Sequence, residues 1–181
     1  MPSLLGVRIT QENVTSGAEF IALLEELSRE LESGGPTVDD FLLRWAAVLP
    51  GEGPGEPGWP GLARQVVAAL AAEPTGGAEA AEGKFDEPEV HTRDQLGALL
   101  TALAADFVRD RREVAAVVAL KGPWWGDTGD WAHGTLSAVL ESWAAWLDAV
   151  LGRPRPFGGG DLEPVTWGSV AEQLLAARVY E

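Results

Sequence analysis

The sequence contains no cysteine, and positively charged residues are scarce. Without cysteine there can be no disulfide bond, cysteine-ligated zinc, iron–sulfur cluster or thiol catalysis, and a reducing compartment is favoured. Only 13 Lys and Arg stand against 28 Asp and Glu, which gives a formal net charge of −15. Nucleic-acid binding needs clustered cations that neutralise phosphates, so we expect no nucleic-acid partner. A basic protein partner remains open.

Long apolar runs are also missing. No run approaches the roughly 18 to 20 residues that a membrane span requires. The opening Met-Pro-Ser-Leu-Leu-Gly lacks the basic and apolar regions of a secretory signal. We therefore expect a cytoplasmic protein with no membrane partner. Its 181 residues are enough to bury a core without metals or disulfides.

The strongest internal signal is a repeat of three blocks that keep their order along the chain. The aligned pairs are 14–30 with 90–106, 37–49 with 135–147, and 59–69 with 167–177. In total, 16 of 41 aligned positions are identical. Richness in alanine and leucine explains some of these matches, but it does not readily explain the paired tryptophans, such as Trp45 with Trp143. We interpret the blocks as a tandem duplication.

Each block has the apolar spacing of a helix that buries one face. In the first pair of aligned blocks, Ser16 and Thr92 each stand where a hydroxyl can cap the first turn of a helix. The sequence therefore predicts an all-α protein: two related three-helix units packed into one globular body. Residues 1–73 form a degenerate copy, 74–89 a linker and 90–181 the fuller copy. The second copy contains an insertion, 110–134, whose apolar run Glu113–Leu120 we expect to be helical.

The second copy resembles a small uncharacterised bacterial helical domain family. Four stretches carry the resemblance, namely Thr92–Leu103, Trp131–Leu136, Ala144–Leu147 and Trp167–Glu181, with its Ala-Ala-Arg-x-Tyr-Glu ending. His133 stands where the family usually has asparagine. The resemblance implies a helical fold and no established activity, and some members of the family are encoded near bacterial toxin and immunity genes.

The insertion contains the candidate partner-binding residues. Trp124 and Trp125 lie between glycines, where we expect a loop that exposes at least one indole. Asp127 and Asp130 follow closely. An exposed tryptophan beside acidic residues is typical of a protein-interface hot spot. We expect the remaining helix tryptophans, Trp45, Trp59, Trp143, Trp146 and Trp167, to lie in the core.

These observations favour a non-catalytic acidic binding protein without a cofactor or a metal. Its partner would be a protein, such as a basic toxin domain that this chain neutralises as an immunity protein. One alternative is a metal-dependent hydrolase that uses Asp127, Asp130 and His133, because two carboxylates and an imidazole can hold a divalent ion. Another is a homodimeric scaffold that pairs through the Glu25-Glu26-rich surface or the tryptophans.

Overall fold

The computed structural model describes residues 14–51, 55–80, 82, 89–125, 129–151 and 164–180. All regular structure within these ranges is helical, which confirms the predicted all-α class. The α-helices are α1 (Gly17–Leu31), α2 (Val38–Val48), α3 (Gly58–Ala71), α4 (Arg93–Lys121), α5 (Leu136–Leu151) and α6 (Trp167–Val179), and the short 3-10 turns are η2 (Leu49–Gly51) and η3 (Pro123–Trp125). No helix in these ranges is both long and apolar enough to cross a membrane.

The first helix of each aligned half begins at the predicted cap. Ser16 Oγ accepts a hydrogen bond from the backbone N–H of Glu19, and Thr92 Oγ1 accepts one from Gln95, both at 3.3 Å. A hydroxyl cap of this kind contributes about 1 kcal/mol to helix stability, because it satisfies an amide that has no partner inside the helix. The two N-caps predicted from the sequence are therefore confirmed.

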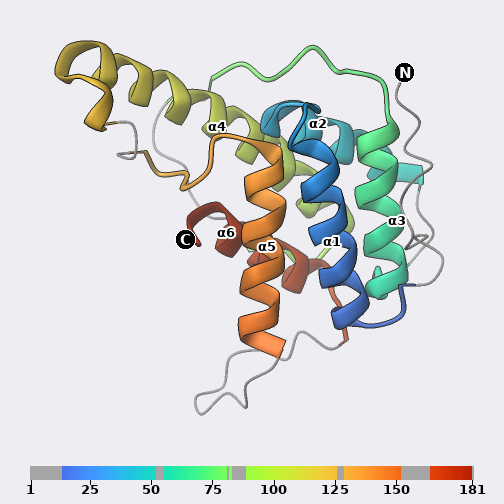
Figure 1. Ribbon diagram of the computed structural model, residues 1–181. Helices are drawn as coiled ribbons and strands as arrows, with labels where there is room; N and C mark the ends of the chain where they lie inside the picture. Colours follow the sequence, from blue (N-terminus) through green and yellow to red (C-terminus); the bar gives the residue numbers. More distant parts are fainter. Residues whose placement is uncertain are drawn as a thin grey trace.

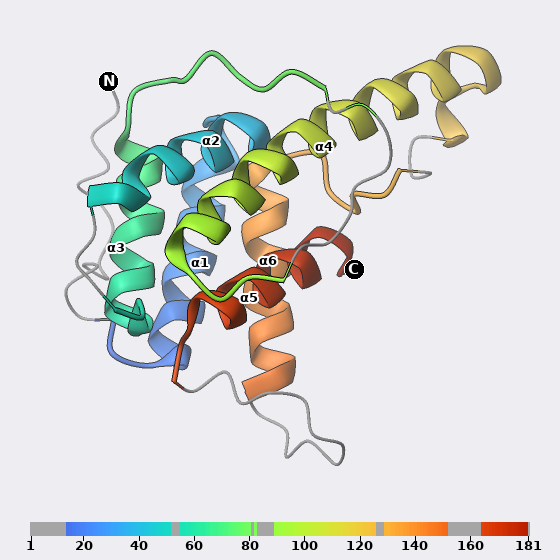
Figure 2. The same ribbon diagram turned by 180° about the vertical axis from the view of Figure 1, so that it is seen from behind.

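Helices that are far apart in the sequence lie side by side. α1 packs along α5, and α2 packs against α4, and these are the most extensive pairings (Figures 1 and 2). α3 contacts α2, and α6 contacts α5. The leucine stripes of α1 and α4 are buried, as expected, but each helix lies chiefly against the Trp-Ala-Ala helix of the other half of the chain.

The centre of the molecule is aromatic. Trp45 on α2 and Trp143 on α5 are fully buried and stack with ring centroids 5.8 Å apart. The rings of Phe20 on α1 and Trp143 form a T-shaped pair with centroids 5.4 Å apart. Trp59 and Trp167, which open α3 and α6, are also buried, and Trp146 is half-buried. The predicted core placement is confirmed for Trp45, Trp59, Trp143 and Trp167, whereas Trp146 only packs against the core.

α4 is 29 residues long, and its last turns extend beyond the body of the molecule (Figures 1 and 2). These turns contain Glu113–Leu120, so the helix predicted for this part of the insertion is confirmed. Gly122 ends the helix with a positive φ of 100°, a conformation that a side chain would strain. Its N–H donates to the carbonyl of Val118 at 2.8 Å, and η3 follows.

The chain that leaves α3 is held against α2. The backbone N–H and the hydroxyl of Thr75 donate to Asp40 Oδ1 at 2.9 and 3.0 Å. Arg44 pairs with the other oxygen of Asp40 and donates to the carbonyl of Ala72 at 2.7 Å. The first residues of the predicted linker, 74–89, are thus fixed on α2, whereas 81 and 83–88 lie outside the described residues.

Candidate functional site

Trp124 and Asp130, the two predicted partner-binding residues whose side chains the structure describes, lie in different parts of the molecule. Trp124 lies in η3 and is 94% exposed, which confirms that the insertion exposes an indole. Asp130 lies before α5, within 3.3 Å of Arg109 on α4. Arg109 precedes Lys121, the last residue of α4, by about 18 Å of helix axis, since each residue adds 1.5 Å. Asp127 and the side chain of Trp125 lie outside the described residues.

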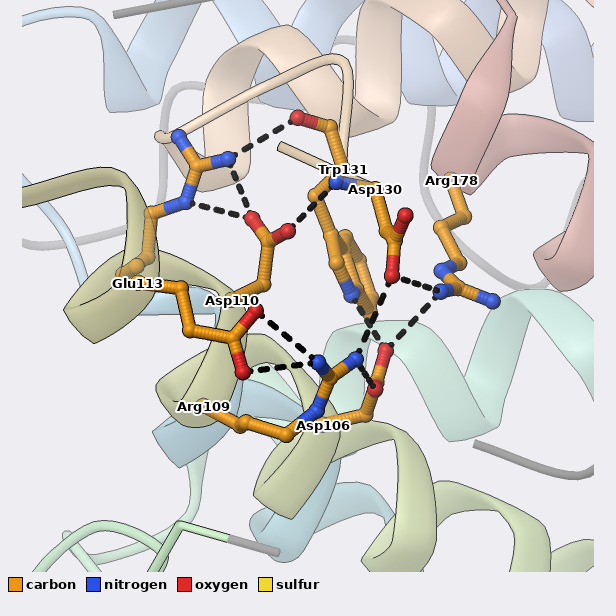
Figure 3. A network of polar contacts seen from close by, with 8 residues as sticks. Asp106, Arg109, Asp110, Glu113, Asp130, Trp131 and Arg178 are labelled. Carbon is orange, nitrogen blue, oxygen red and sulfur yellow. Dashed lines mark hydrogen bonds and ion pairs between the residues drawn. The ribbon is translucent and has the colours of Figure 1, made fainter. Parts of the chain in front are cut away.

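Asp130 belongs to a polar network that joins α4, the segment before α5 and α6 (Figure 3). Asp106 on α4 is its fully buried centre. One carboxylate oxygen of Asp106 accepts from the indole N–H of Trp131 at 2.9 Å and lies 3.1 Å from Arg178 Nη2. The other oxygen accepts from Arg109 Nη2 at 2.5 Å. One carboxylate therefore connects three elements.

The charges in this network are compensated. Asp130 Oδ2 lies 3.3 Å from Arg109 Nη2 and 3.9 Å from Arg178 Nη2, and Glu113 accepts from Arg109 Nη1 at 3.1 Å. The hydrogen bond to Asp106 is the largest factor that raises the pKa of Arg109 above its usual value, and it outweighs the effect of burial. A charge removed from water needs such partners, because an unpaired buried ion costs several kcal/mol.

Asp110, one helical turn after Asp106, holds the segment before α5 in place. Its Oδ1 accepts the backbone N–H of Asp130 at 2.5 Å, and its Oδ2 accepts from Arg111 Nε at 3.0 Å. Arg111 also donates to the carbonyl of Trp131 at 2.9 Å. The backbone passes so close that a Cβ on Gly129 would lie 2.6 Å from Asp110 Oδ2. A side chain at position 129 would therefore force this carboxylate to shift and would disturb its hydrogen bonds.

The same segment pairs with the end of α6. The N–H of Ala132 donates to the carbonyl of Arg178 at 2.9 Å. His133 Nε2 lies 2.9 Å from the carbonyl oxygen of Tyr180, which also accepts from Ser142 Oγ at 2.7 Å. These contacts satisfy the last carbonyls of α6. The whole network, which we call the polar clamp, therefore holds α4, α5 and α6 together.

Asp130 and His133, two of the three residues of the alternative metal site, have other partners. Asp130 faces two guanidinium groups, and His133 is bonded to a backbone carbonyl. Two guanidinium groups this close to Asp130 disfavour a divalent ion there, since like charges repel. In the described part of the chain, no three side chains of His, Cys, Asp or Glu gather as metal ligands. The third predicted ligand, Asp127, lies outside that part.

An acidic groove of about 430 Å³ lies between α1 and α5, and we call it the α1–α5 groove. The lining residues have the same helical spacing on both sides of the groove, namely positions i, i+3, i+4 and i+7. These residues are Glu25, Ser28 and Arg29 on α1 with its C-cap Glu32, and Glu141, Ala144, Ala145 and Asp148 on α5. The two acidic residues on each helix are exposed, whereas Ser28 and Ala144 are buried between them.

The groove concentrates negative charge over a floor of small side chains. Four carboxylates line it, and within the described lining Arg29 is the sole base. Ser28 Oγ donates to the carbonyl of Ser137 at 2.9 Å, so the buried hydroxyl is already satisfied. The glutamates of the first helix are evident in the sequence, whereas the groove is not. The missing information was the pairing of α1 with α5, which no local spacing encodes.

Comparison with protein-family models, curated proteins and solved structures finds no match to this chain.

Proposed function

We propose that this chain is a non-catalytic acidic protein that binds a basic protein partner in the α1–α5 groove. Within that class, we propose the role of an immunity protein that neutralises a basic toxin domain, in the cytoplasm. The observation that carries the proposal is the groove itself, where Glu25, Glu32, Glu141 and Asp148 surround small residues. A basic helix or loop can approach a floor of serine and alanine closely, and it meets carboxylates on both sides.

Charge supports this proposal both before the two proteins touch and after they have bound. The formal net charge of −15 attracts a basic partner before contact, which raises the association rate. Once the partner is bound, the exposed carboxylates select for lysine and arginine at matching positions. Exposed ion pairs contribute only about 0.2 to 1 kcal/mol each, so the charges set specificity and rate, and apolar contacts must supply further affinity.

Calorimetric titration with the basic products of neighbouring genes tests the proposal. We expect binding that is stronger at about 0.01 M than at about 0.15 M salt, because the Debye length falls from roughly 30 to 8 Å. Replacement of Glu141 and Asp148 by lysine should weaken binding at least tenfold, or about 1.4 kcal/mol. Absence of binding to any of these products at low salt would contradict the proposal.

A matched control variant distinguishes binding in the groove from the effect of overall net charge. Replacement of Glu79 and Glu172 by lysine changes the formal net charge from −15 to −11, the same change as Glu141→Lys with Asp148→Lys, because each reversal adds two charges. Both control residues are exposed, and neither lines the groove. If the two double variants lost equal affinity, charge alone would explain binding and the groove would not be the site.

We also propose that the chain is a tandem duplication whose halves interlock, with unit boundaries at 1–73 and 90–181. The indoles at the aligned positions Trp45 and Trp143 support this, because each donates to an aligned glutamine, Gln65 at 3.2 Å or Gln173 at 3.0 Å. Superposition of the two halves in an experimental structure tests it. If these tryptophan–glutamine pairs did not coincide, the duplication would be wrong.

A further inference from the structure

The end of α4 and η3 form an exposed apolar arm, residues 112–125. Leu120 is 85% exposed and Trp124 is 94% exposed, the two most exposed large apolar side chains in the described part of the chain. Ala115, Ala116 and Ala119 are exposed beside them. Large apolar side chains on a protruding element favour burial in an interface, because each gains about 1.5 to 3 kcal/mol when it leaves water.

The arm differs in charge from the rest of the molecule. It contains Arg112 and Lys121, and its one acid, Glu113, is engaged by Arg109 at 3.1 Å. The arm is therefore an apolar helix end with a net positive charge, attached to a body with a large negative charge. Its complement is a floor of small side chains bordered by carboxylates. The α1–α5 groove has this composition, with Ser28 and Ala144 on its floor, four acids along its sides and one base, Arg29.

The arm cannot fill the groove of its own chain. α1 and α5 lie on one face of the molecule and α4 crosses the opposite face, with the arm directed away from both (Figures 1 and 2). We infer that the arm docks in the α1–α5 groove of a second copy, and that the second copy returns its own arm to the groove of the first. Two copies then close a two-fold dimer.

Both arms must dock if the dimer is to bury the surface area that a stable interface needs. A stable interface buries about 800 Å² on each partner, whereas one tryptophan buries roughly 150 to 250 Å². One arm with Leu120 and Trp124 is too small by itself. Two arms and two grooves double the contact, and a two-fold arrangement leaves neither arm exposed. The groove of about 430 Å³ has room for the leucine and part of the indole.

A lipid surface is the competing occupant of the arm. Insertion of Leu120 and Trp124 gains only a few kcal/mol, which is comparable with the marginal membrane binding of a single acyl chain. The observations therefore favour the second copy. The inference rests on the proposed function only because both use the groove, so that a basic partner must displace the arm.

Sedimentation equilibrium over a dilution series tests the dimer directly. The wild-type chain should shift from monomer to twice its mass of 19.2 kDa as concentration rises. Leu120→Ser with Trp124→Ser should remain monomeric. Val179→Ser should dimerise normally, because Val179 is another exposed apolar residue, 58% exposed, but lies on α6. A wild-type monomer at every concentration, or a dimer that the arm variant leaves intact, would overturn the inference.

A charge exchange identifies the contact. Arg112→Glu with Lys121→Glu, and Glu141→Lys with Asp148→Lys, should each weaken the dimer at least tenfold, because like charges then meet in both grooves. A mixture of the two variants should form a heterodimer near wild-type strength, since every arm meets an opposite charge. Unchanged circular dichroism spectra would show that the variants fold. Failure of the mixture to associate would contradict docking in this groove.

Two further measurements separate the remaining outcomes. The chain should not co-sediment with vesicles of phosphatidylcholine and phosphatidylserine. If it did, and if this binding depended on Trp124, the arm would bind a lipid surface and not a second copy, and the inference would be wrong. The monomeric arm variant should bind the basic partner more tightly than the wild type, because its groove is open. If the dimer fails while partner binding persists, the proposed function survives without this inference.

Discussion

The indoles of Trp45 and Trp143 stack at the centre of the molecule, with their planes inclined by 24°. The stack joins α2 to α5, and each indole N–H is satisfied by the side-chain carbonyl of a buried glutamine, Gln65 or Gln173. A buried indole needs such an acceptor, because an unpaired polar group in the core costs the hydration that it has lost.

The two glutamines should differ in their contribution to stability. Gln65→Leu and Gln173→Leu each leave an indole N–H unpaired, so we expect both to lower the free energy of unfolding by about 1 to 3 kcal/mol. Gln173 Nε2 is buried without a hydrogen-bond partner among the described residues, and its removal offsets part of the loss. Urea denaturation followed by circular dichroism should show the larger loss for Gln65→Leu, and the reverse order would contradict this reading.

The helical elements were predictable because their signals are local. The i, i+3, i+4, i+7 leucine stripes, the hydroxyl caps and the glycine-rich breaks all act within one or two turns, and they place the starts of α1 and α4 correctly, although not the full length of α4. The choice of which helices pack together has no such local signal. A stripe indicates that a helix buries one face but not which helix covers it, so the packing of α1 on α5 could not be found from spacing.

The polar clamp was missed for a related reason. Asp106 lies at the end of an apolar stripe, Trp131 is 25 residues away and Arg178 is 72 residues away. No local pattern links these side chains, because they meet only after α4 and α6 have packed. The sequence predicts that Asp130 binds a partner, and no local signal shows that it also faces two arginines. Its side chain remains 55% exposed.

Asp106 should be the most sensitive position of the clamp. Asp106→Asn removes the charge that faces Arg109 and Arg178, and it leaves both guanidinium groups less compensated. Breaking a buried ion pair by removing one partner costs about 3 to 5 kcal/mol. We expect a loss of that size in urea denaturation.

The matched control for Asp106 is Glu172→Gln, because Glu172 is an exposed acid on α6. Surface substitutions of this kind change stability by about 0.5 kcal/mol or less. If Asp106→Asn behaved like Glu172→Gln, the network would be a minor contributor to the fold.

Two glycines should respond to alanine with opposite signs. A Cβ on Gly129 would lie 2.6 Å from the fixed carboxylate of Asp110, so Gly129→Ala should destabilise by about 1 to 3 kcal/mol. Gly97 lies inside α4, and a Cβ there meets only Leu49 at an ordinary 3.7 Å. Gly97→Ala should stabilise by about 0.5 to 1 kcal/mol, because alanine favours the helix. Thermal melts compare both, and equal signs would refute the packing described.

Asp40 should produce an acid-sensitive component of stability. Burial raises the pKa of Asp40, but the hydrogen bonds from Arg44 and Thr75 outweigh burial and hold the pKa below its usual value. A carboxyl whose folded pKa is depressed stabilises the fold above its unfolded pKa, near 3.9. That stabilisation is lost as the pH falls through the lower, folded pKa, because protonation then breaks the pair with Arg44.

The expected signature is a difference that depends on pH. At pH 7, Asp40→Asn should unfold with a free energy about 1.5 to 3 kcal/mol below that of the wild type, the range for a hydrogen bond to a charged group. Below the folded pKa, the two proteins should converge, because the wild-type carboxyl is then neutral as well. Urea denaturation at a series of pH values measures the difference directly, and it cancels the titration of the other acids that both proteins share. A gap that stayed constant down to acid pH would show that Asp40 stabilises the fold through its shape and not through its charge.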